Sequence, residues 1–358
     1  MVSHTYVEPE NRGKLRALAA VGPVTAVIPA RWRQTSLGRQ WRLDAPATEA
    51  GVRLVPVPWR GPARATLGGM RPPAGAVPQG AVLQIEEEPW TPTAFATARR
   101  GLGAATVLFT WENVDRRFPF PWSAMRRAVF RRLAGLIAGN AAAVEVARAQ
   151  GYRGPVAVIS QLGVELPAQV ARPDSDTLRL AYVGRLVPEK GVDLLLRAAA
   201  TLASPWRLTI VGDGPARPTL ESLAATSGLG ERVRFLGARP HDQVAGIWPE
   251  TDALVLPSRS TPRWKEQLGH VLLEAMAHGV ATVGSTCGSI PEVIGDAGLV
   301  FTEGSVESLA ESLRMLALGP DPLRRLGEAG RRRVAGHFTN ERIAARTRAF
   351  HDEVLAAR

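Results

Sequence analysis

The sequence predicts an α/β protein with two doubly wound, Rossmann-like domains that face a central cleft. Apolar runs typical of buried strands alternate with helical patterns through both halves of the 358 residues, as in βα units on a parallel sheet. Between the two series, residues 171–177 are polar and contain a proline, which is typical of a linker. In such sheets ligands bind beyond the carboxyl ends of the strands, so we expect the functional residues there.

The first series predicts an N-terminal domain over residues 1–170. Its buried strands are expected at 24–30, 52–58, 81–87, 105–111 and 155–160. Its helices are expected at 12–20, 92–101, 122–138 and 141–150. The rest of residues 31–80 is rich in proline, glycine and arginine, and we assign no further element there.

The second series predicts a C-terminal domain over residues 178–339. Its strands are expected at 178–184, 207–212, 232–237, 253–257 and 280–285, with helices between them. The last segment, 340–358, is expected to be a helix that packs back on the N-terminal domain.

Composition limits the setting of the protein. A hydrophobic content of 45% is enough for two packed domains. The single cysteine, Cys287, excludes an internal disulfide and favours a reducing cytosol. No apolar run reaches the ~18–20 residues of a membrane span, and no signal peptide opens the chain. We therefore expect a cytoplasmic location, with the inner face of the membrane as a second, peripheral site.

The positive charge lies entirely in the first half. Residues 1–172 hold 22 basic and 11 acidic side chains, whereas residues 173–358 hold 22 of each, within a net charge of +11. Such a field attracts phospholipid surfaces, nucleic acid or anionic substrates. The segment 121–141 predicts a basic amphipathic helix, with Trp122, Met125, Val129, Leu133 and Leu136 on one stripe and Arg126, Arg127, Arg131 and Arg132 elsewhere. It either contacts an anionic membrane or packs on the sheet with its arginines in water.

Glycine turns follow two strands of the second domain. Arg185 and Lys190 bracket a loop after the first of them, and two cations beside a helix N-terminus suit a pyrophosphate. Solvated loop charges are the alternative. Gly212 and Gly214 let backbone approach a ligand closely or simply make a tight turn. Because Arg217 stands where the last glycine of GxGxxG would be, a dinucleotide fingerprint is not supported.

Two carboxylates in "KEQLGHVLLE", Glu266 and Glu274, raise the question of an acid/base pair. In a continuous helix they would be ~12 Å apart and turned by ~80°, whereas a retaining glycosidase needs ~5–5.5 Å. We expect Glu266 in the loop before a helix and Glu274 inside it, with separate tasks. The amides of Gln267, Leu268 and Gly269 would then face an anion.

Two other groupings allow more than one interpretation. His270, Glu274 and His278 recur every four residues, but no matching ligand set lies nearby, so a hydrogen bond along the helix is favoured over a metal. The three carboxylates of "EEEPW", residues 86–90, either raise the pKa of one member through repulsion or are solvated loop charges.

Taken together, these motifs resemble a known family. "EQLGHVLLE", followed by "AMAHG" and "GSIPEVIGDAGLVF", is similar to the retaining nucleotide-sugar glycosyltransferases of family 4 (group 1), which have the GT-B fold. "GRLVPEKG", "VGDGP", "FLG" and "LVLPS" occur in the same order as in that family. The resemblance covers residues 155–345, and "VLFTWEN", "AGNAAAVEVARAQGY" and "QLGVE" extend it more loosely into the first half.

The resemblance implies roles for individual residues. Arg185 and Lys190 would neutralise the donor diphosphate, Glu274 would accept hydrogen bonds from the ribose, and Glu266 would contact the transferred sugar. The remaining donor-binding positions would be Gly184, Gly212, Gly214, Ala238 and Arg239 near the base, and Gln267, Leu268, Gly269 and His270. No metal or other cofactor is implied, because cationic side chains and amides stabilise the leaving diphosphate. The acceptor would bind to the N-terminal domain.

The first half departs from the family pattern at two places. In "TWEN", Glu112 stands where many relatives have a histidine, and it would contact the acceptor or the sugar as a catalytic group. Gly13 is the one glycine where relatives often have a Gly-Gly loop after the first strand. Together with Glu87, Gly13 is our candidate for an acceptor or phosphate loop.

We therefore predict a retaining hexosyltransferase that uses a nucleoside-diphosphate sugar, in glycan, glycolipid or polysaccharide assembly. The resemblance implies attack from the face that the diphosphate leaves. The acceptor, lipid-linked or free, is not specified by the sequence. Rival functions are a sugar-nucleotide epimerase or a glycan phosphorylase on the same fold, or a basic nucleic-acid-binding protein. No nucleic-acid recognition motif occurs, so nucleic acid is not an expected partner.

Overall fold

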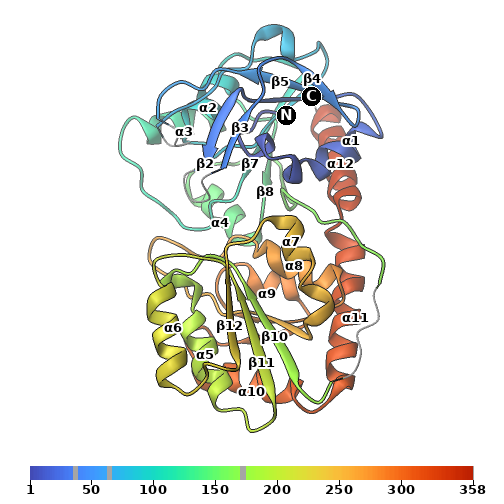
Figure 1. Ribbon diagram of the computed structural model, residues 1–358. Helices are drawn as coiled ribbons and strands as arrows, with labels where there is room; N and C mark the ends of the chain where they lie inside the picture. Colours follow the sequence, from blue (N-terminus) through green and yellow to red (C-terminus); the bar gives the residue numbers. More distant parts are fainter. Residues whose placement is uncertain (35–38, 63–66, 170–174, 358) are drawn as a thin grey trace. The chain divides into compact units, whose positions relative to one another are not determined.

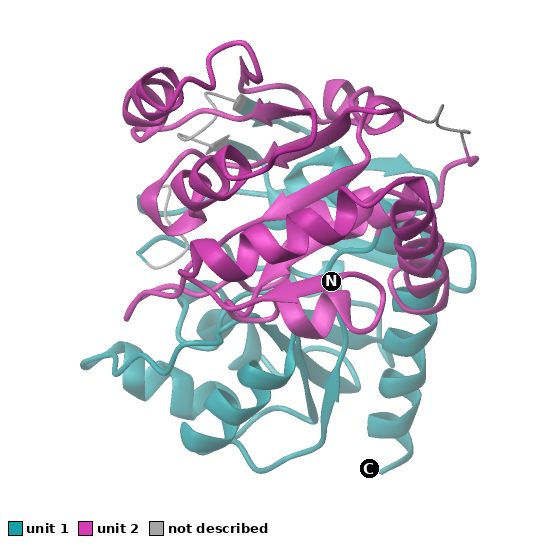
Figure 2. Ribbon diagram, turned by 90° about the horizontal axis from the view of Figure 1, so that it is seen from below, with its two compact units in different colours: residues 1–163, 340–358 teal, residues 164–339 magenta. Residues whose placement is uncertain are grey.

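The computed structural model describes residues 1–34, 39–62, 67–169 and 175–357. The chain divides into two compact units. Unit 1 comprises Met1–Gly163 and Asn340–Arg358, and unit 2 comprises Val164–Thr339 (Figure 2). The division falls before the expected boundary at residue 170, because the backbone amide of Val164 donates to the carbonyl of Phe338 and the guanidinium of Arg331 donates to the carbonyl of Pro167. Of the expected linker, residues 171–174 lie outside the described residues.

Unit 2 is built on a six-stranded parallel sheet in the order β12-β11-β10-β13-β14-β15. Its strands are β10 (Leu178–Val183), β11 (Trp206–Val211), β12 (Val233–Gly237), β13 (Ala253–Leu256), β14 (Ala281–Ser285) and β15 (Leu299–Phe301). Counted along the chain this order is 3-2-1-4-5-6, the doubly wound order whose direction reverses between the first and fourth strands. That switch point lies between β10 and β13.

The helices of unit 2 pack on this sheet (Figure 1). They are α5 (Val192–Ala200), α6 (Arg217–Thr226), α7 (His241–Ala245), α8 (His270–Ala277), α9 (Ile290–Ile294), α10 (Val306–Leu316) and α11 (Pro320–His337). The inner strands β10, β11, β13 and β14 are largely buried, whereas the edge strands β12 and β15 are mostly half-buried. Helices α5 and α8 bury apolar faces that include Leu195, Leu196, Leu272 and Met276. Such continuous apolar strands are expected when helices cover both faces of a parallel sheet.

Unit 1 contains a second sheet with the same winding. Its strands are β1 (Val24–Pro29), β4 (Ala47–Glu49), β5 (Val52–Val57), β6 (Val82–Ile85), β7 (Ala105–Thr110), β8 (Gly135–Ala138) and β9 (Val156–Val158). The orders are β1-β5-β4 and β6-β7-β8-β9, and β4 alone is antiparallel to its neighbour. Bridges from Val2 to Val27 and to Ile85 join the two parts.

The segment Met1–Ser3 therefore takes the place of a central strand. Val2 donates a backbone hydrogen bond to Gln84 and accepts one from Glu86, while Ser3 donates to Val27. With this segment counted first, the parallel strands again run 3-2-1-4-5-6-7, with the switch point between Met1–Ser3 and β6. The sequence analysis missed this strand because its few residues carry no periodic pattern.

The helices of unit 1 are α1 (Gly13–Ala19), α2 (Pro92–Ala98), α3 (Trp122–Phe130), α4 (Ala141–Ala149) and α12 (Asn340–Ala356). Helices α2 and α4 begin at side-chain caps, in which Thr91 accepts from the amide of Ala94 and Asn140 from that of Ala143. Helix α12 packs against α1 and lies in unit 1, as Figure 2 shows in teal. The final residue, Arg358, is outside the described range.

Three expectations about the elements were wrong or incomplete. The helix expected over 122–138 ends at Phe130, and residues 135–138 form β8, whose Leu136 is fully buried in the sheet. The unassigned region contains the hairpin β2 (Arg31–Gln34) and β3 (Arg39–Arg42) as well as β4. The short strand β15 was not expected either. The basic amphipathic helix proposed for 121–141 is thus one short helix followed by a core strand. No helix within the described residues has the length and apolar character needed to cross a membrane.

Candidate active site

The polar residues of unit 2 gather at the carboxyl edge of its sheet, at the switch point. Lys190 lies in the loop that follows β10, and Ser258 and Glu266 lie in the loop that follows β13. The Nζ of Lys190 is 2.6 Å from Oε2 of Glu266, and the hydroxyl of Ser258 donates to the same oxygen at 2.9 Å. Both ends of the ion pair are mostly buried, with 14% and 10% of their side chains exposed. The two residues expected to bind different parts of a donor therefore contact each other.

An aromatic ring completes this cluster. The Nζ of Lys190 lies 4.9 Å from the ring centroid of Trp264, a distance at which a cation is attracted to the face of an indole. The sequence analysis did not identify Trp264 or Ser258 as functional residues. The motif "LVLPS" contained Ser258, but nothing in its spacing showed that its hydroxyl meets Glu266.

Arg185 is differently placed from Lys190. Its side chain is exposed, and its backbone carbonyl accepts a hydrogen bond of 2.9 Å from the hydroxyl of the buried Tyr182. This contact fixes the backbone of the loop just after β10 while the guanidinium remains in solvent. Arg185 is therefore free to meet an anion without breaking a buried contact.

The glycine turns pack on one another. A Cβ added to Gly212, whose φ is 140°, would lie 1.8 Å from the carbonyl oxygen of Gly184. A Cβ on Gly214 would lie 2.4 Å from the carbonyl oxygen of Leu186. The structure thus explains these glycines by the close approach of two strand-end loops. It brings Gly184, Gly212 and Gly214 together at the carboxyl edge of the sheet.

Glu274 has a separate set of partners on α8. Its Oε1 lies 2.8 Å from Nδ1 of His270, the hydrogen bond along the helix that the sequence predicted, and 3.7 Å from Nδ1 of His241. Burial would raise the pKa of this carboxyl, but the bond to His270 and the charges of the nearby histidines outweigh burial and lower it. Glu274 is therefore an anion at neutral pH. The sequence did not indicate His241 as a neighbour of Glu274. This histidine lies two residues after Arg239, and Ala238 and Arg239 are both exposed.

The loop between the two carboxylates is tightly held. Glu266 is in the loop and Glu274 in α8, as the sequence predicted. The hydroxyl of Ser289 donates to the backbone carbonyls of Glu266, at 3.1 Å, and of Gln267. Gly269 caps α8 with a left-handed φ of 66°. The amides of residues 267–269 precede the helix, where no intrahelical carbonyl can accept from them.

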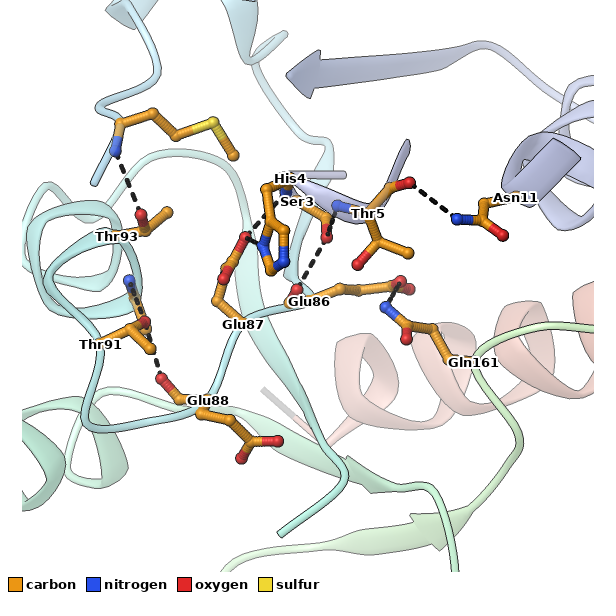
Figure 3. A network of polar contacts seen from close by, with 12 residues as sticks. Ser3, His4, Thr5, Asn11, Glu86, Glu87, Glu88, Thr91, Thr93 and Gln161 are labelled. Atoms are coloured by element: carbon orange, nitrogen blue, oxygen red, sulfur yellow. Dashed lines mark hydrogen bonds and ion pairs between the residues drawn. The ribbon is translucent and has the colours of Figure 1, made fainter. Parts of the chain in front are cut away.

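Unit 1 carries its polar residues at the corresponding edge. Figure 3 shows the carboxylates of Glu86, Glu87 and Glu88 pointing in different directions, Glu87 toward His4 and Glu86 toward Gln161. Glu86 is fully buried and is paired with the buried ammonium of Lys14. Burial alone would raise the pKa of Glu86, but Lys14 and hydrogen bonds from Tyr6 and Gln161 lower it.

The neighbouring carboxyls Glu88 and Glu112 behave in the opposite way. Burial raises the pKa of Glu88 to about 7, although Thr110 and the amide of Trp111 donate to it. Burial and then the charge of Glu88 raise the pKa of Glu112 to about 8. The raised pKa expected within "EEEPW" thus falls on Glu88, and its main cause is burial rather than repulsion. Trp90 donates a hydrogen bond of 2.9 Å to Oε2 of Glu112. The other carboxyl oxygen of Glu112, Oε1, is buried and has no hydrogen-bond partner among the described residues.

His4 and Glu87 form a polar pair at the switch point of unit 1. The backbone amide of His4 donates to Oε1 of Glu87 at 2.8 Å, and the ring Nδ1 lies 2.6 Å from the same oxygen. Burial would lower the pKa of His4, but the charge of Glu87 and this bond raise it. No pattern in the sequence indicated His4.

Gly13 lies where two helices of unit 1 meet. It is the first residue of α1, is buried, and has an ordinary helical φ of −52°. A Cβ on Gly13 would lie 2.3–2.5 Å from the side chain of Asn340. Its lack of a side chain is therefore explained by the contact between α1 and the start of α12.

Among the described residues, no group of three or more His, Cys, Asp or Glu side chains is arranged to hold a metal ion. Nδ1 of His270 and Nδ1 of His241 both face the carboxylate of Glu274. Among the cations of unit 2, Arg185 and Lys190 both lie in the loop that follows β10.

Comparison with known proteins identifies the family of unit 2. Residues 167–333 match the family model described as "Glycosyl transferases group 1". A 2-deoxystreptamine glucosyltransferase of Streptomyces kanamyceticus is 29% identical over 65% of this chain and 64% of its own length. An N-acetyl-alpha-D-glucosaminyl L-malate synthase of Bacillus anthracis is 36% identical over 49% of this chain and 45% of its own. The matches thus span about half to two thirds of these relatives.

Solved structures agree with the fold. A sucrose-phosphate synthase from Thermosynechococcus elongatus superposes with a TM-score of 0.69 over 97% of this chain and 93% of that one, at 20% identity. The Anabaena protein HepE, solved in complex with UDP, gives a TM-score of 0.63 over 76% of this chain and 79% of its own, at 18% identity. At such identities the likeness concerns the fold alone. The expected class of two Rossmann-like α/β domains is confirmed.

Proposed function

We propose that this chain, whose residues 167–333 match the group 1 glycosyltransferases, is itself such an enzyme. It would transfer a hexosyl group from a nucleoside-diphosphate sugar to an acceptor hydroxyl with retention of configuration. The observation that carries the proposal is the cluster at the switch point of unit 2. There a mostly buried lysine–glutamate pair and an exposed arginine lie in the loops that follow β10 and β13, and a second carboxylate is held separately on the following helix, α8. This combination offers cations for a diphosphate and acceptors for hydroxyl groups.

Arg185 and Lys190 bind the diphosphate of the donor. In the transition state the bond between C1 of the sugar and the phosphate oxygen breaks, and negative charge grows on the departing diphosphate. Two cations fixed near that oxygen stabilise the charge more than they stabilise the ground state. This electrostatic role also makes a metal unnecessary, and no other cofactor is proposed.

Glu266 and Glu274 bind different hydroxyl groups of the donor. Glu274 is held as an anion on α8 and accepts hydrogen bonds from the ribose. Glu266 stands beside Lys190 and accepts from hydroxyls of the transferred sugar. The amides of Gln267, Leu268 and Gly269 donate to phosphate or sugar oxygens, and the exposed Ala238 and Arg239 lie at the base.

Retention follows if the acceptor oxygen attacks from the face that the diphosphate leaves. The C1–O bond to the acceptor forms as the C1–O bond to phosphate breaks, and the acceptor proton passes to a phosphate oxygen. No protein carboxylate then needs to approach C1 as a nucleophile. Glu112, neutral at pH 7 through its raised pKa of about 8, would instead donate a hydrogen bond to the acceptor or sugar.

Unit 1 is proposed to bind the acceptor, and the product belongs to glycan, glycolipid or polysaccharide assembly. A lipid-linked acceptor would favour peripheral attachment of a cytoplasmic enzyme to an anionic membrane. The structure reduces the number of arginines in this segment that could contact a membrane. Arg127, Arg131 and Arg132 are exposed at the end of α3, whereas two nitrogens of Arg126 are buried, so only the first three are available to lipid.

The proposal is tested with a panel of nucleoside-diphosphate sugars. Purified protein is incubated with each donor and with candidate acceptors, and release of the nucleoside diphosphate is measured. We expect release with at least one donor, stimulated by an acceptor. An epimerase would interconvert donors without net release, and a phosphorylase would need inorganic phosphate. Absence of diphosphate binding by calorimetry across the panel would refute the assignment.

A further inference from the structure

We propose that His4, Trp32, Trp59 and Glu87 form a binding site in unit 1 for a polyhydroxylated six-membered ring, a sugar or a cyclitol, as the acceptor of the transfer. The identity of this ring as acceptor rests on the function proposed above. The site itself rests on the geometry of unit 1. None of the four residues except Glu87 was indicated by the sequence.

Each of the four residues lies just after the carboxyl end of a strand, and the four strands are neighbours. Trp59 follows β5, Trp32 follows β1 on the hairpin strand β2, His4 follows Met1–Ser3, and Glu87 follows β6. These strands are adjacent in the sheet, and the last two flank its switch point. Ligands of doubly wound sheets bind outside the carboxyl ends of the strands at this point.

The rings contact one another and remain partly exposed. The His4 and Trp32 centroids are 4.9 Å apart, those of Trp32 and Trp59 are 4.8 Å apart in an edge-to-face arrangement, and those of His4 and Trp59 are 6.4 Å apart. Each of the three is only half-buried. The indole Nε1 of Trp59 donates to the carbonyl of Pro62 at 2.8 Å, so this ring is fixed in orientation. Rigid, partly exposed indoles offer a large apolar area at little cost in side-chain entropy.

The pair of His4 and Glu87 adds a directed polar group. Glu87 has 1% of its side chain exposed, and it binds both the backbone amide and the Nδ1 of His4. Because Nδ1 is engaged by the carboxylate, Nε2 is the ring nitrogen left for a ligand, and it has no hydrogen-bond partner among the described residues. A hydroxyl can both donate and accept, so it matches Nε2 in the neutral and in the protonated imidazole. Figure 3 shows the imidazole of His4 directed at Glu87.

This chemistry favours a polyhydroxylated ring over an acyl chain. A sugar or cyclitol presents axial C–H groups on one face and hydroxyls at its edge, so its face packs on an indole while an edge hydroxyl reaches Nε2. An acyl chain would cover the imidazole and leave its free nitrogen without a partner, which is costly when water is excluded. The ring is therefore the occupant to which we commit.

Binding to the full-length protein is measured by saturation-transfer NMR with methyl α-D-glucopyranoside, methyl α-D-mannopyranoside, myo-inositol and octyl β-D-glucopyranoside as probes. We expect at least one ring probe to bind. Trp32→Ala and Trp59→Ala should each weaken its binding at least fivefold, and His4→Ala should do the same. The matched control is Trp122→Ala, which removes a half-buried tryptophan of α3 outside this cluster. Glu87→Gln should weaken binding less than His4→Ala, because the amide still accepts from His4.

The affinity for nucleoside diphosphate, measured by calorimetry on the same samples, should stay unchanged in all these variants. If diphosphate binds but no ring probe does, or if Trp122→Ala weakens the ring probe as much as Trp32→Ala, the acceptor site is refuted while the donor function stands. Saturation transfer confined to the octyl chain would also refute it in favour of an apolar chain site. If rings bind normally and diphosphate does not, the proposed transfer fails and the ring site survives. Circular dichroism and melting temperatures establish that each variant folds.

Discussion

The Nζ of Lys190 lies 2.6 Å from Oε2 of Glu266, within a pair that is mostly buried. The partner charge holds the lysine beside the strand end where the diphosphate is proposed to bind. It also means that the two residues are coupled, since removing either leaves a poorly hydrated charge behind. Lys190 and Arg185, which share one proposed role, should therefore differ in their effects on stability.

Lys190→Ala and Arg185→Ala should each slow transfer by about 30- to 1,000-fold, because one charge-assisted contact in a dry site is worth ~2–4 kcal/mol. Lys190→Ala should also lower the free energy of unfolding by about 2 kcal/mol through the unpaired Glu266, whereas Arg185→Ala, an exposed change, should not. Donor turnover and urea denaturation measure the two effects. Lys265→Ala, at an exposed neighbouring lysine, is the control. Near-normal turnover in both variants would contradict the assignment of the diphosphate site.

Glu274→Gln should weaken binding of the free nucleoside diphosphate by roughly 10-fold or more, since a hydrogen bond to a charged acceptor contributes ~1.5–3 kcal/mol. Glu266→Gln should leave that binding nearly intact and reduce turnover, because its proposed partner is the transferred sugar. Calorimetric titration and kinetics on the same preparations separate the two. An equal loss of diphosphate affinity in both variants would show that the tasks are not divided between these carboxylates.

The raised pKa values of Glu88 and Glu112 predict a pH dependence of stability. The folded values of about 7 and 8 exceed the ordinary value of 4.5, so the folded state binds more protons between these limits. Their contribution is fully present below pH 4.5 and is lost as the pH rises through 7 to 8. The free energy of unfolding of Glu112→Gln, taken relative to that of the unchanged protein, should therefore be higher at pH 8.5 than at pH 5.5. We expect this increase to be a few kcal/mol at most.

Urea denaturation at the two pH values checks this dependence. The difference between variant and unchanged protein isolates Glu112 from other shifted groups, such as His351, whose pKa is lowered to about 4 mainly by burial. Glu145→Gln, at an exposed position of α4, is the control and should show no such difference. A pH-independent effect of Glu112→Gln would mean that this carboxyl titrates normally in the folded protein.

Gly212→Ala should destabilise unit 2 by about 3 kcal/mol or more, because the new Cβ would lie 1.8 Å from the carbonyl oxygen of Gly184 at a φ of 140°. Gly230→Ala is the matched control, since its Cβ would meet nothing within 4 Å. Thermal denaturation of both proteins measures the difference. Equal melting temperatures would show that the two loops can separate without cost.

Changing Arg127, Arg131 and Arg132 together to Gln should reduce co-sedimentation with anionic vesicles at low salt, at about 1 kcal/mol per residue. Neutral vesicles should bind neither protein. A control triple, Arg197, Arg207 and Arg234 to Gln, removes three exposed charges from unit 2 instead. If the unchanged protein does not sediment with anionic vesicles even at low salt, peripheral attachment through α3 is excluded.

The sequence by itself determined the fold class and most of the strands, because continuous apolar runs bounded by turns report burial on both faces of a parallel sheet. It also placed Glu266 in a loop and Glu274 in a helix, since the apolar spacing after Gly269 has the helical period. It merged α3 and β8 into one helix, because a short buried strand and a helical face share the same apolar residues. The spacing of apolar residues therefore predicted the local structure of long segments well and that of short segments poorly.

Tertiary structure alone decided which side chains meet. The pairing of Lys190 with Glu266, the approach of His241 to Glu274 and the cluster of His4, Trp32 and Trp59 each join residues from different strand ends. The order of strands in the sheet brings them together, and no spacing along the chain encodes that order directly. The pKa of Glu112 likewise depends on burial and on the charge of Glu88, which follows a different strand. Periodicity reports how each segment faces its own surroundings, whereas a site is made where several segments end side by side.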